Sequence, residues 1–188
     1  MQTRRYGAAL AALTMAAVGV GVAAPTTAGA AATAVACQTG WGSLPKTAVD
    51  ADLGSLTDIR TGRQACYDRM VFDVPTAGSD TIGYTVHYVD TFYQDPTGTR
   101  IPISGGAIIE VVVSAPSYDL ETHEATYPGR GGRPLPGVDL TGYRTFRDAK
   151  FGASFEGTTQ IGLGVRARLP FRVFQLPDRL VVDVAHSW

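Results

Sequence analysis

The chain has 188 residues, of which 45% are hydrophobic and 18% are charged, and its formal net charge at pH 7 is −1. This length suits one domain, and the near-neutral charge argues against general nucleic-acid binding, which requires a basic domain. Two cysteines without Cys-x-x-Cys spacing and three scattered histidines argue against a metal site.

Residues 1–36 have the layout of a cleavable secretory signal peptide. Arg4 and Arg5 form a short positive segment, an uncharged run covers Tyr6 to Ala24, and small residues near Ala30–Ala36 supply cleavage positions. The run is rich in Ala and Gly, which favours a cleaved signal over a retained membrane anchor. We therefore predict an exported protein. The arginine pair leaves both the general secretory route and the twin-arginine route open.

The predicted mature domain, residues 37–188, contains two cysteines, Cys37 and Cys66. An even number of cysteines in an exported chain favours one disulfide between them. The alternative is a lipoprotein in which Cys37 is the acylated first residue, but Ala34 occupies a position where leucine is preferred. The protein would be held at a membrane only in that alternative.

The mature chain shows the period-two alternation of half-buried β-strands. The predicted inward-facing residues are Met70, Phe72 and Val74; Ile82, Tyr84, Val86 and Tyr88; Ile109, Val111 and Val113; and Ile161, Leu163, Val165, Ala167 and Leu169. Asp95-Pro96-Thr97-Gly98 has the residue preferences of a type I turn, and Pro177-Asp178 predicts a tight hairpin between 171–176 and 179–185. Only a short helical turn near 147–151 is left open. The pattern therefore predicts an all-β sandwich or barrel.

Two segments interrupt this pattern. Residues 116–142 are so rich in Gly and Pro that they cannot continue a β-ladder. A loop of this length is either functional or a surface excursion, here one held by Leu135, Leu140 and Tyr143. In the second segment, residues 40–60, we expect Trp41 and Leu44 to pack against the domain.

No catalytic motif is present. The three histidines are His87, His123 and His186, and none has the spacing of a metal ligand pair. Asp73, Glu110 and Asp183 each lie within an apolar strand, where a raised pKa would suit a general acid. We favour the simpler interpretation that these carboxylates lie on an outer face or pair with arginines such as Arg69 or Arg179.

Charge is distributed unevenly along the chain. Residues 37–125 contain five Lys and Arg against twelve Asp and Glu, whereas residues 126–188 contain nine against five. A basic C-terminal half can contact an anionic wall polymer or a lipid surface. The simpler interpretation is that strands from the two halves interleave, so that their charges cancel in space.

The outward side of the 160–169 strand is the candidate ligand-binding face. It is formed by Gln160, Gly162, Gly164, Arg166 and Arg168. Small residues allow a ligand or a second backbone to approach closely, and arginines offer planar donors to carboxylates and phosphates. The predicted ligand-binding residues are Arg166, Arg168, Tyr143 and Arg144, with Arg147 nearby. The alternative is that the long loop or a neighbouring aromatic side chain covers the glycines.

The C-terminal segment Phe174-Gln175-Leu176-Pro177-Asp178-Arg179-Leu180-Val181-Val182-Asp183-Val184 resembles the closing hairpin of the amidase N-terminal (AMIN) domain. Arg69-Met70-Val71-Phe72-Asp73 resembles an earlier copy of that strand. The wider chain is similar to the AMIN-like domain of exported proteins and lipoproteins of actinobacteria. This similarity is carried by Cys37-Gln38-Thr39-Gly40-Trp41-Gly42-Ser43, Tyr127-Pro128-Gly129-Arg130, Gly142-Tyr143-Arg144-Thr145-Phe146 and the segment to Trp188.

The resemblance implies a β-sandwich without catalytic activity or a cofactor, located outside the cytoplasm and associated with the cell wall. Peptidoglycan or another wall glycan is the implied ligand. Residues 116–142 have no obvious counterpart in the AMIN domain, so a second hypothesis is that this loop recognises another exported protein. A third and less favoured hypothesis is a wall hydrolase with an unrecognised pair of carboxylates.

Overall fold

The computed structural model describes residues 37, 40–49, 54–75 and 81–188, all within one compact unit, Val35–Trp188. The predicted signal peptide, residues 1–36, lies outside the described residues. The regular structure of the described residues consists of strands, which confirms the all-β prediction. Nowhere in these ranges is there a helix with the length and apolar character needed to cross a bilayer.

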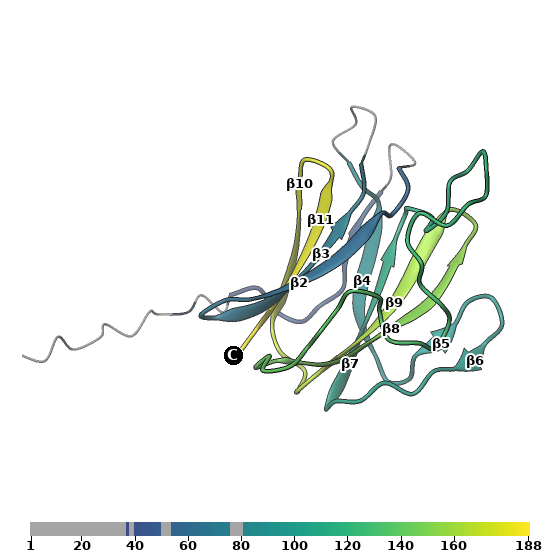
Figure 1. Cartoon of the computed structure of the whole chain (residues 1–188). Helices are drawn as coiled ribbons and strands as arrows, with labels where there is room; N and C mark the ends of the chain where they lie inside the picture. Colours follow the sequence, from purple (N-terminus) through teal and green to yellow (C-terminus); the bar gives the residue numbers. More distant parts are fainter. Residues whose placement is uncertain (1–36, 38–39, 50–53, 76–80) are drawn as a thin grey trace, which may run out of the picture. The chain divides into compact units, whose positions relative to one another are not determined.

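The strands form two sheets and a short hairpin (Figure 1). They are β1 Lys46–Ala48, β2 Asp58–Arg63, β3 Tyr67–Asp73, β4 Tyr84–Val89, β5 Tyr93–Gln94, β6 Thr99–Arg100, β7 Ala107–Val113, β8 Phe146–Phe155, β9 Thr158–Val165, β10 Phe171–Leu176 and β11 Arg179–Ala185. The five-stranded sheet has the order β1-β4-β7-β9-β8, the four-stranded sheet has the order β10-β11-β3-β2, and β5 pairs with β6. Strand β8 occupies 146–155, where the sequence left a helical turn open.

The core lies between the two sheets, as expected for a β-sandwich. The predicted inward-facing residues that are buried are Met70, Phe72, Val74, Ile82, Val86, Ile109, Val111, Val113, Ile161, Leu163, Val165 and Leu169. Tyr84, Tyr88 and Ala167 are partly buried against the same cluster. The period-two prediction is thus confirmed for the side chains that form the core.

Strand β9 differs from the prediction in two ways. It ends at Val165, so Arg166 and Arg168 lie beyond the strand rather than on its outward face. In addition, Phe92 and Ile103 cover the outward face at Gly162, where an added Cβ would lie 2.7 Å from the Phe92 ring. The alternative interpretation, that a neighbouring aromatic side chain covers the glycines, is therefore the correct one, and this face is not open to a ligand.

Both predicted connections join the expected strands. The Pro177-Asp178 hairpin is confirmed, because Leu176 pairs with Arg179 on the adjacent strand. For the connection between β5 and β6, the predicted turn type is wrong, because the Gly98 N–H donates to the Gln94 carbonyl oxygen over 2.8 Å. This bond closes a five-residue turn rather than the four-residue type I turn that was expected.

The predicted disulfide is confirmed, with 5.3 Å between the Cα atoms of Cys37 and Cys66. It ties the segment before β1 to the residue that precedes β3. Trp41 packs edge-on against Tyr67 with 5.6 Å between ring centroids, as predicted. Leu44 is 74% exposed, so its predicted packing is wrong, and the Lys46 side chain instead lies 4.2 Å from the centre of the Phe171 ring.

Gly164→Ala tests the close contact between β9 and the 103–104 segment. An added Cβ would collide with the Ser104 carbonyl oxygen, a backbone atom that cannot move independently. We expect the free energy of unfolding, measured in urea, to fall by roughly 1–3 kcal/mol. Gly40→Ala is the matched control, because a Cβ there meets no atom within 4 Å. Equal stabilities of the two variants would contradict the contact.

Replacing both Cys37 and Cys66 with Ala should lower the free energy of unfolding by about 2–5 kcal/mol, because the unfolded chain gains freedom. A reducing agent should lower the urea midpoint of the wild type and leave that of the double variant unchanged. A wild-type midpoint that does not respond to reduction would show that the two cysteines are not bonded.

Candidate functional site

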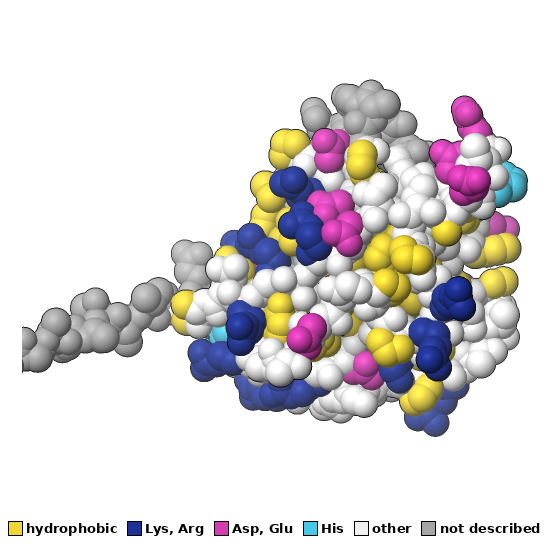
Figure 2. Space-filling view, in the orientation of Figure 1, with side chains coloured by type: hydrophobic (Ala, Val, Ile, Leu, Met, Phe, Trp, Pro, Cys, Tyr) yellow, Lys and Arg dark blue, Asp and Glu magenta, His cyan; other side chains and the backbone are white. Residues whose placement is uncertain are grey.

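Five arginines lie at one end of the sandwich, where β2 and β9 end and β8 begins. They are Arg63, Arg144, Arg147, Arg166 and Arg168, and we call this surface the basic end. All five are exposed, and none has a carboxylate oxygen of a described residue within 4.0 Å. Figure 2 shows Lys and Arg side chains gathered along this end of the domain. The basic end therefore carries guanidinium groups that are not closed into ion pairs, although Asp139 lies within electrostatic range of Arg63.

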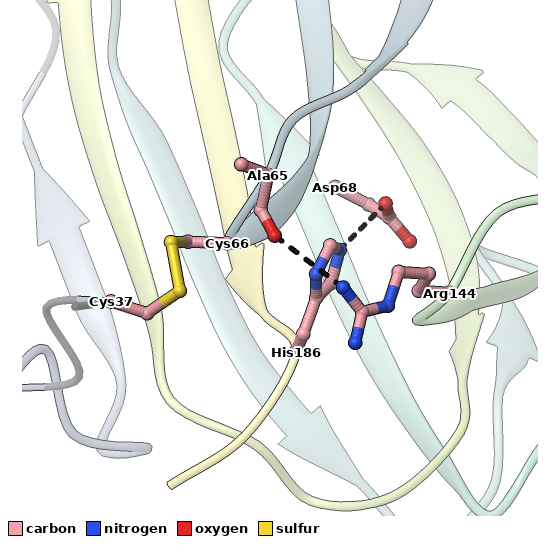
Figure 3. Close-up of a disulfide and its surroundings, with 6 residues drawn as sticks. All are labelled: Cys37, Ala65, Cys66, Asp68, Arg144 and His186. Atoms are coloured by element: carbon pink, nitrogen blue, oxygen red, sulfur yellow. Dashed lines mark hydrogen bonds and ion pairs between the residues drawn. A yellow bond between two sulfur atoms is a disulfide. The ribbon is translucent and has the colours of Figure 1, made fainter. Parts of the chain in front are cut away.

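A buried carboxylate holds this end together. Asp68 is fully buried, and its Oδ2 accepts hydrogen bonds from the backbone N–H groups of Thr145 and Phe146. Its Oδ1 lies 3.0 Å from His186 Nε2. The carboxylate thus connects the start of β3, the start of β8 and the residue after β11. Figure 3 shows this pair beside the disulfide, with Arg144 next to it.

Arg144 and Arg166 both lie next to this junction. Arg144 Nη1 is 3.5 Å from the carbonyl oxygen of Ala65. The backbone N–H of Arg166 donates to the carbonyl of Thr145 over 2.8 Å, and its guanidinium donates to the carbonyl of His186. The Arg166 guanidinium is therefore positioned by a backbone carbonyl, whereas the contact of Arg144 is long, and both side chains remain exposed.

Arg168 lies on a neighbouring edge. Its guanidinium carbon is 4.8 Å from the centre of the Tyr88 ring, and its nitrogens lie 3.4 Å from the side-chain and backbone oxygens of Ser43. It also borders a cavity of about 360 Å³ that Tyr88 and Asp90 help to line. The prediction placed Arg166 and Arg168 on one strand face, whereas the structure turns them toward different neighbours.

Tyr143 is half-buried rather than displayed at the surface. Its ring stacks on Phe146 with 5.7 Å between centroids and 9° between the planes. The Arg63 guanidinium carbon lies 6.0 Å from the centre of the same ring. Arg147 donates to the carbonyl oxygens of Tyr143 and Arg144, both over 3.0 Å, and so fixes the turn before β8. Sequence analysis missed Arg63, because only the folded chain brings the end of β2 beside this turn.

The outer face of the four-stranded sheet carries a second group of arginines, which sequence analysis did not predict as a cluster. Asp183 is fully buried and receives hydrogen bonds from Arg69 Nε at 2.7 Å and Arg172 Nε at 2.8 Å. Arg172 also lies 4.4 Å from the Trp41 ring centre and 5.0 Å from that of Phe174. Cross-strand register makes this arrangement, since Asp183 pairs with Arg172 on one side and with Arg69 on the other.

The remaining strand carboxylates are also bonded. Asp73 accepts from Arg60 Nε at 2.6 Å and from Arg179 Nε at 3.0 Å. These contacts, chiefly the hydrogen bond from Arg60, hold the pKa of the Asp73 carboxyl below its usual value. Glu110 accepts from Gln160 Nε2 at 2.6 Å. The interpretation that strand carboxylates pair with arginines such as Arg69 and Arg179 is therefore confirmed for Asp183 and Asp73.

The three histidines lie in separate parts of the fold. His87 Nε2 is 3.3 Å from a Glu110 carboxylate oxygen, His186 is paired with Asp68, and His123 is exposed in a loop. Within the described ranges, no group of three or more His, Cys, Asp and Glu side chains is placed to hold a metal ion.

Negative charge gathers away from the basic end. One loop contains Asp119, Glu121 and Glu124, and the surrounding residues 114–129 include no Lys or Arg. Figure 2 shows Asp and Glu side chains over this part of the surface. The charges of the two chain halves cancel at Asp73 and Asp183, but they do not cancel over the whole domain.

A family model described as the AMIN-like domain matches residues 54–186 of this chain, which is more than half of its length. No curated protein and no solved structure matches the chain. The matched residues include β2 to β11, and therefore both sheets and the five arginines of the basic end.

Asp68→Ala tests whether the buried carboxylate organises this end. The substitution leaves two backbone N–H groups and His186 without their acceptor, so the free energy of unfolding should fall by about 3–5 kcal/mol. Asp90→Ala, which removes an exposed carboxylate, should change it by no more than about 0.5 kcal/mol. Urea unfolding of both variants checks this, and a loss below about 1 kcal/mol in Asp68→Ala would contradict the assigned role.

Proposed function

We propose, because this chain belongs to the AMIN-like domain family, that it is an exported protein that binds peptidoglycan, or another wall glycan, through its basic end. At the coarser level, the family is one of non-catalytic binding modules related to the cell wall. The proposal adds the ligand and the surface that recognises it.

The observation that carries the proposal is the set of exposed arginines without carboxylate partners at one end of the sandwich. Peptidoglycan is built from glycan strands and short peptides, and these peptides carry carboxylates. Guanidinium groups offer planar, paired N–H donors that match a carboxylate. A surface with several such groups attracts an anionic polymer and orients its carboxylates.

The way these arginines are anchored supports binding. Arg144 and Arg166 each direct a guanidinium nitrogen to a backbone carbonyl, and Arg168 lies against the Tyr88 ring. A guanidinium has five N–H donors, so each side chain keeps donors for a ligand. Side chains that are already positioned lose less conformational entropy on binding, which favours affinity.

Location outside the cytoplasm is supported by the disulfide between Cys37 and Cys66, because such bonds persist in oxidising compartments. The predicted signal peptide over residues 1–36 agrees with export. The bonded cysteine also speaks against acylation of Cys37, since an acylated Cys37 could not form this bond.

The double substitution Arg166→Glu and Arg168→Glu tests the proposed surface. We expect several-fold weaker co-sedimentation with purified cell-wall sacculi, because two donors become carboxylates that repel the wall peptides. Raising the salt concentration should weaken binding of the wild type in the same assay, because salt screens charge attraction.

The control is Arg100→Glu with Arg130→Glu, which makes the same change in net charge at two exposed arginines outside the basic end. Thermal melting of both double variants verifies that they fold. If both variants co-sediment like the wild type, the basic end does not bind the wall. If both weaken equally, net charge rather than this surface governs binding, and the assignment of the basic end fails.

A further inference from the structure

The long connection between β7 and β8 helps to form a second candidate site, a cavity of about 550 Å³. The charged residues beside this cavity are acidic, unlike those of the basic end. Its walls include Ser117, Tyr118, His123, Tyr127, Phe151 and Ser154, and we call it the aromatic pocket. We propose that the aromatic pocket binds one neutral pyranose ring of a glycan, of the N-acetylhexosamine type. The inference rests on the proposed function and adds a sugar subsite to it.

The floor of the pocket is rigid. Tyr127 and Phe151 are each 3% exposed, and their ring centroids lie 6.2 Å apart. The Tyr127 hydroxyl donates to the Pro136 carbonyl over 3.0 Å, which fixes the ring in place. Gly129 crosses directly over Phe151, where a Cβ would collide with the ring. The long loop is therefore seated on the sheet by aromatic packing rather than detached from it.

The open side of the pocket presents two further rings. Tyr118 is half-buried and His123 is exposed, and the two rings meet edge to face with 6.3 Å between centroids. Their loop is closed by a β-bridge from Tyr118 to Ala125, and Asp119 Oδ1 accepts the backbone N–H of Thr122 over 2.7 Å. Ordered aromatic surfaces of this kind suit the flat C–H face of a sugar ring, which is apolar.

The pocket also contains a polar group that lacks a partner. Ser117 is only 6% exposed, and its hydroxyl makes no hydrogen bond to any described residue, although its backbone N–H donates to Ser154 Oγ over 2.8 Å. The Tyr118 hydroxyl is likewise without a hydrogen bond in the described part of the chain. The Ser117 oxygen is not one of the fully buried unpaired atoms of the described residues, so both hydroxyls are accessible to a hydroxyl or amide of a ligand in the pocket.

Charge selects among possible ligands. The loop beside the pocket carries Asp119, Glu121 and Glu124, and no Lys or Arg lies between residues 114 and 129. A ligand carboxylate or phosphate would be repelled there, whereas the hydroxyls of a neutral sugar can donate to carboxylates. The two surfaces thus bind different parts of the wall polymer: the basic end binds peptide carboxylates, and the aromatic pocket binds a neutral sugar ring.

The test is an NMR titration of the isotope-labelled protein with chitotriose, a trimer of β-1,4-linked N-acetylglucosamine. We expect amide shifts in residues 117–129 and a Kd on the order of 1 mM. Tyr118→Ala should weaken binding at least about tenfold, which corresponds to about 1.4 kcal/mol. Tyr93→Ala is the control, because Tyr93 is 52% exposed in the β5–β6 hairpin and does not line the pocket.

A second variant, Ser117→Ala, replaces Tyr118→Ala if the latter does not fold. Absence of shifts up to about 10 mM chitotriose would overturn the inference, since a Kd of about 1 mM would be nearly saturated there. Equal weakening by Tyr118→Ala and Tyr93→Ala would also overturn it. Neither outcome bears on wall binding by the basic end. If the basic end does not bind the wall, the arginine variants co-sediment with sacculi like the wild type, and chitotriose still binds in the aromatic pocket.

Discussion

The organisation of the basic end depends on one buried charge, the Asp68 carboxylate. Its oxygens are occupied by two backbone N–H groups at the start of β8 and by His186 after β11. An ionised carboxylate without these donors would be very unfavourable inside a β-sandwich, so the three chain segments must converge on it. Arg144 precedes this junction and Arg166 bonds to it through Thr145 and His186. The positions of Arg144 and Arg166 therefore depend on a residue that is itself fully buried.

Two groups of carboxylates in the domain differ in their partners: one group is paired with arginines, and the other forms no ion pair with a described residue. Asp183 and Asp73 lie on the outer face of the four-stranded sheet and are each held by two arginines, which removes them as free acids or bases. The carboxylates of the 119–124 loop and the arginines of the basic end form no ion pair with a described residue, and they lie in different regions. A surface with separated charges of both signs suits recognition of a polymer that has neutral and anionic parts.

The sequence predicts the strands well because side-chain alternation is a local property of extended backbone. Met70 and Phe72, or Ile161 and Leu163, face the core wherever the rest of the chain goes. Alternation does not predict that the outward face at Gly162 is covered, because the covering ring belongs to Phe92, which lies in a connection distant in sequence. Asp68 carries no local signal either, since its partners Thr145 and His186 lie 77 and 118 residues away. The candidate site is therefore only partly predictable from sequence. The sequence indicates most of its arginines, but it does not indicate the buried junction around Asp68.

The most direct test of the central claim is an NMR titration of the labelled protein with soluble muropeptides that retain their stem peptides, followed by mass analysis of the ligand. Binding without catalysis through the basic end predicts shift changes in residues 144–147 and 166–168, alongside those that the sugar ring produces in residues 117–129, with every muropeptide recovered at its original mass. Shift changes confined to other surfaces, or the appearance of cleaved fragments, would contradict the account.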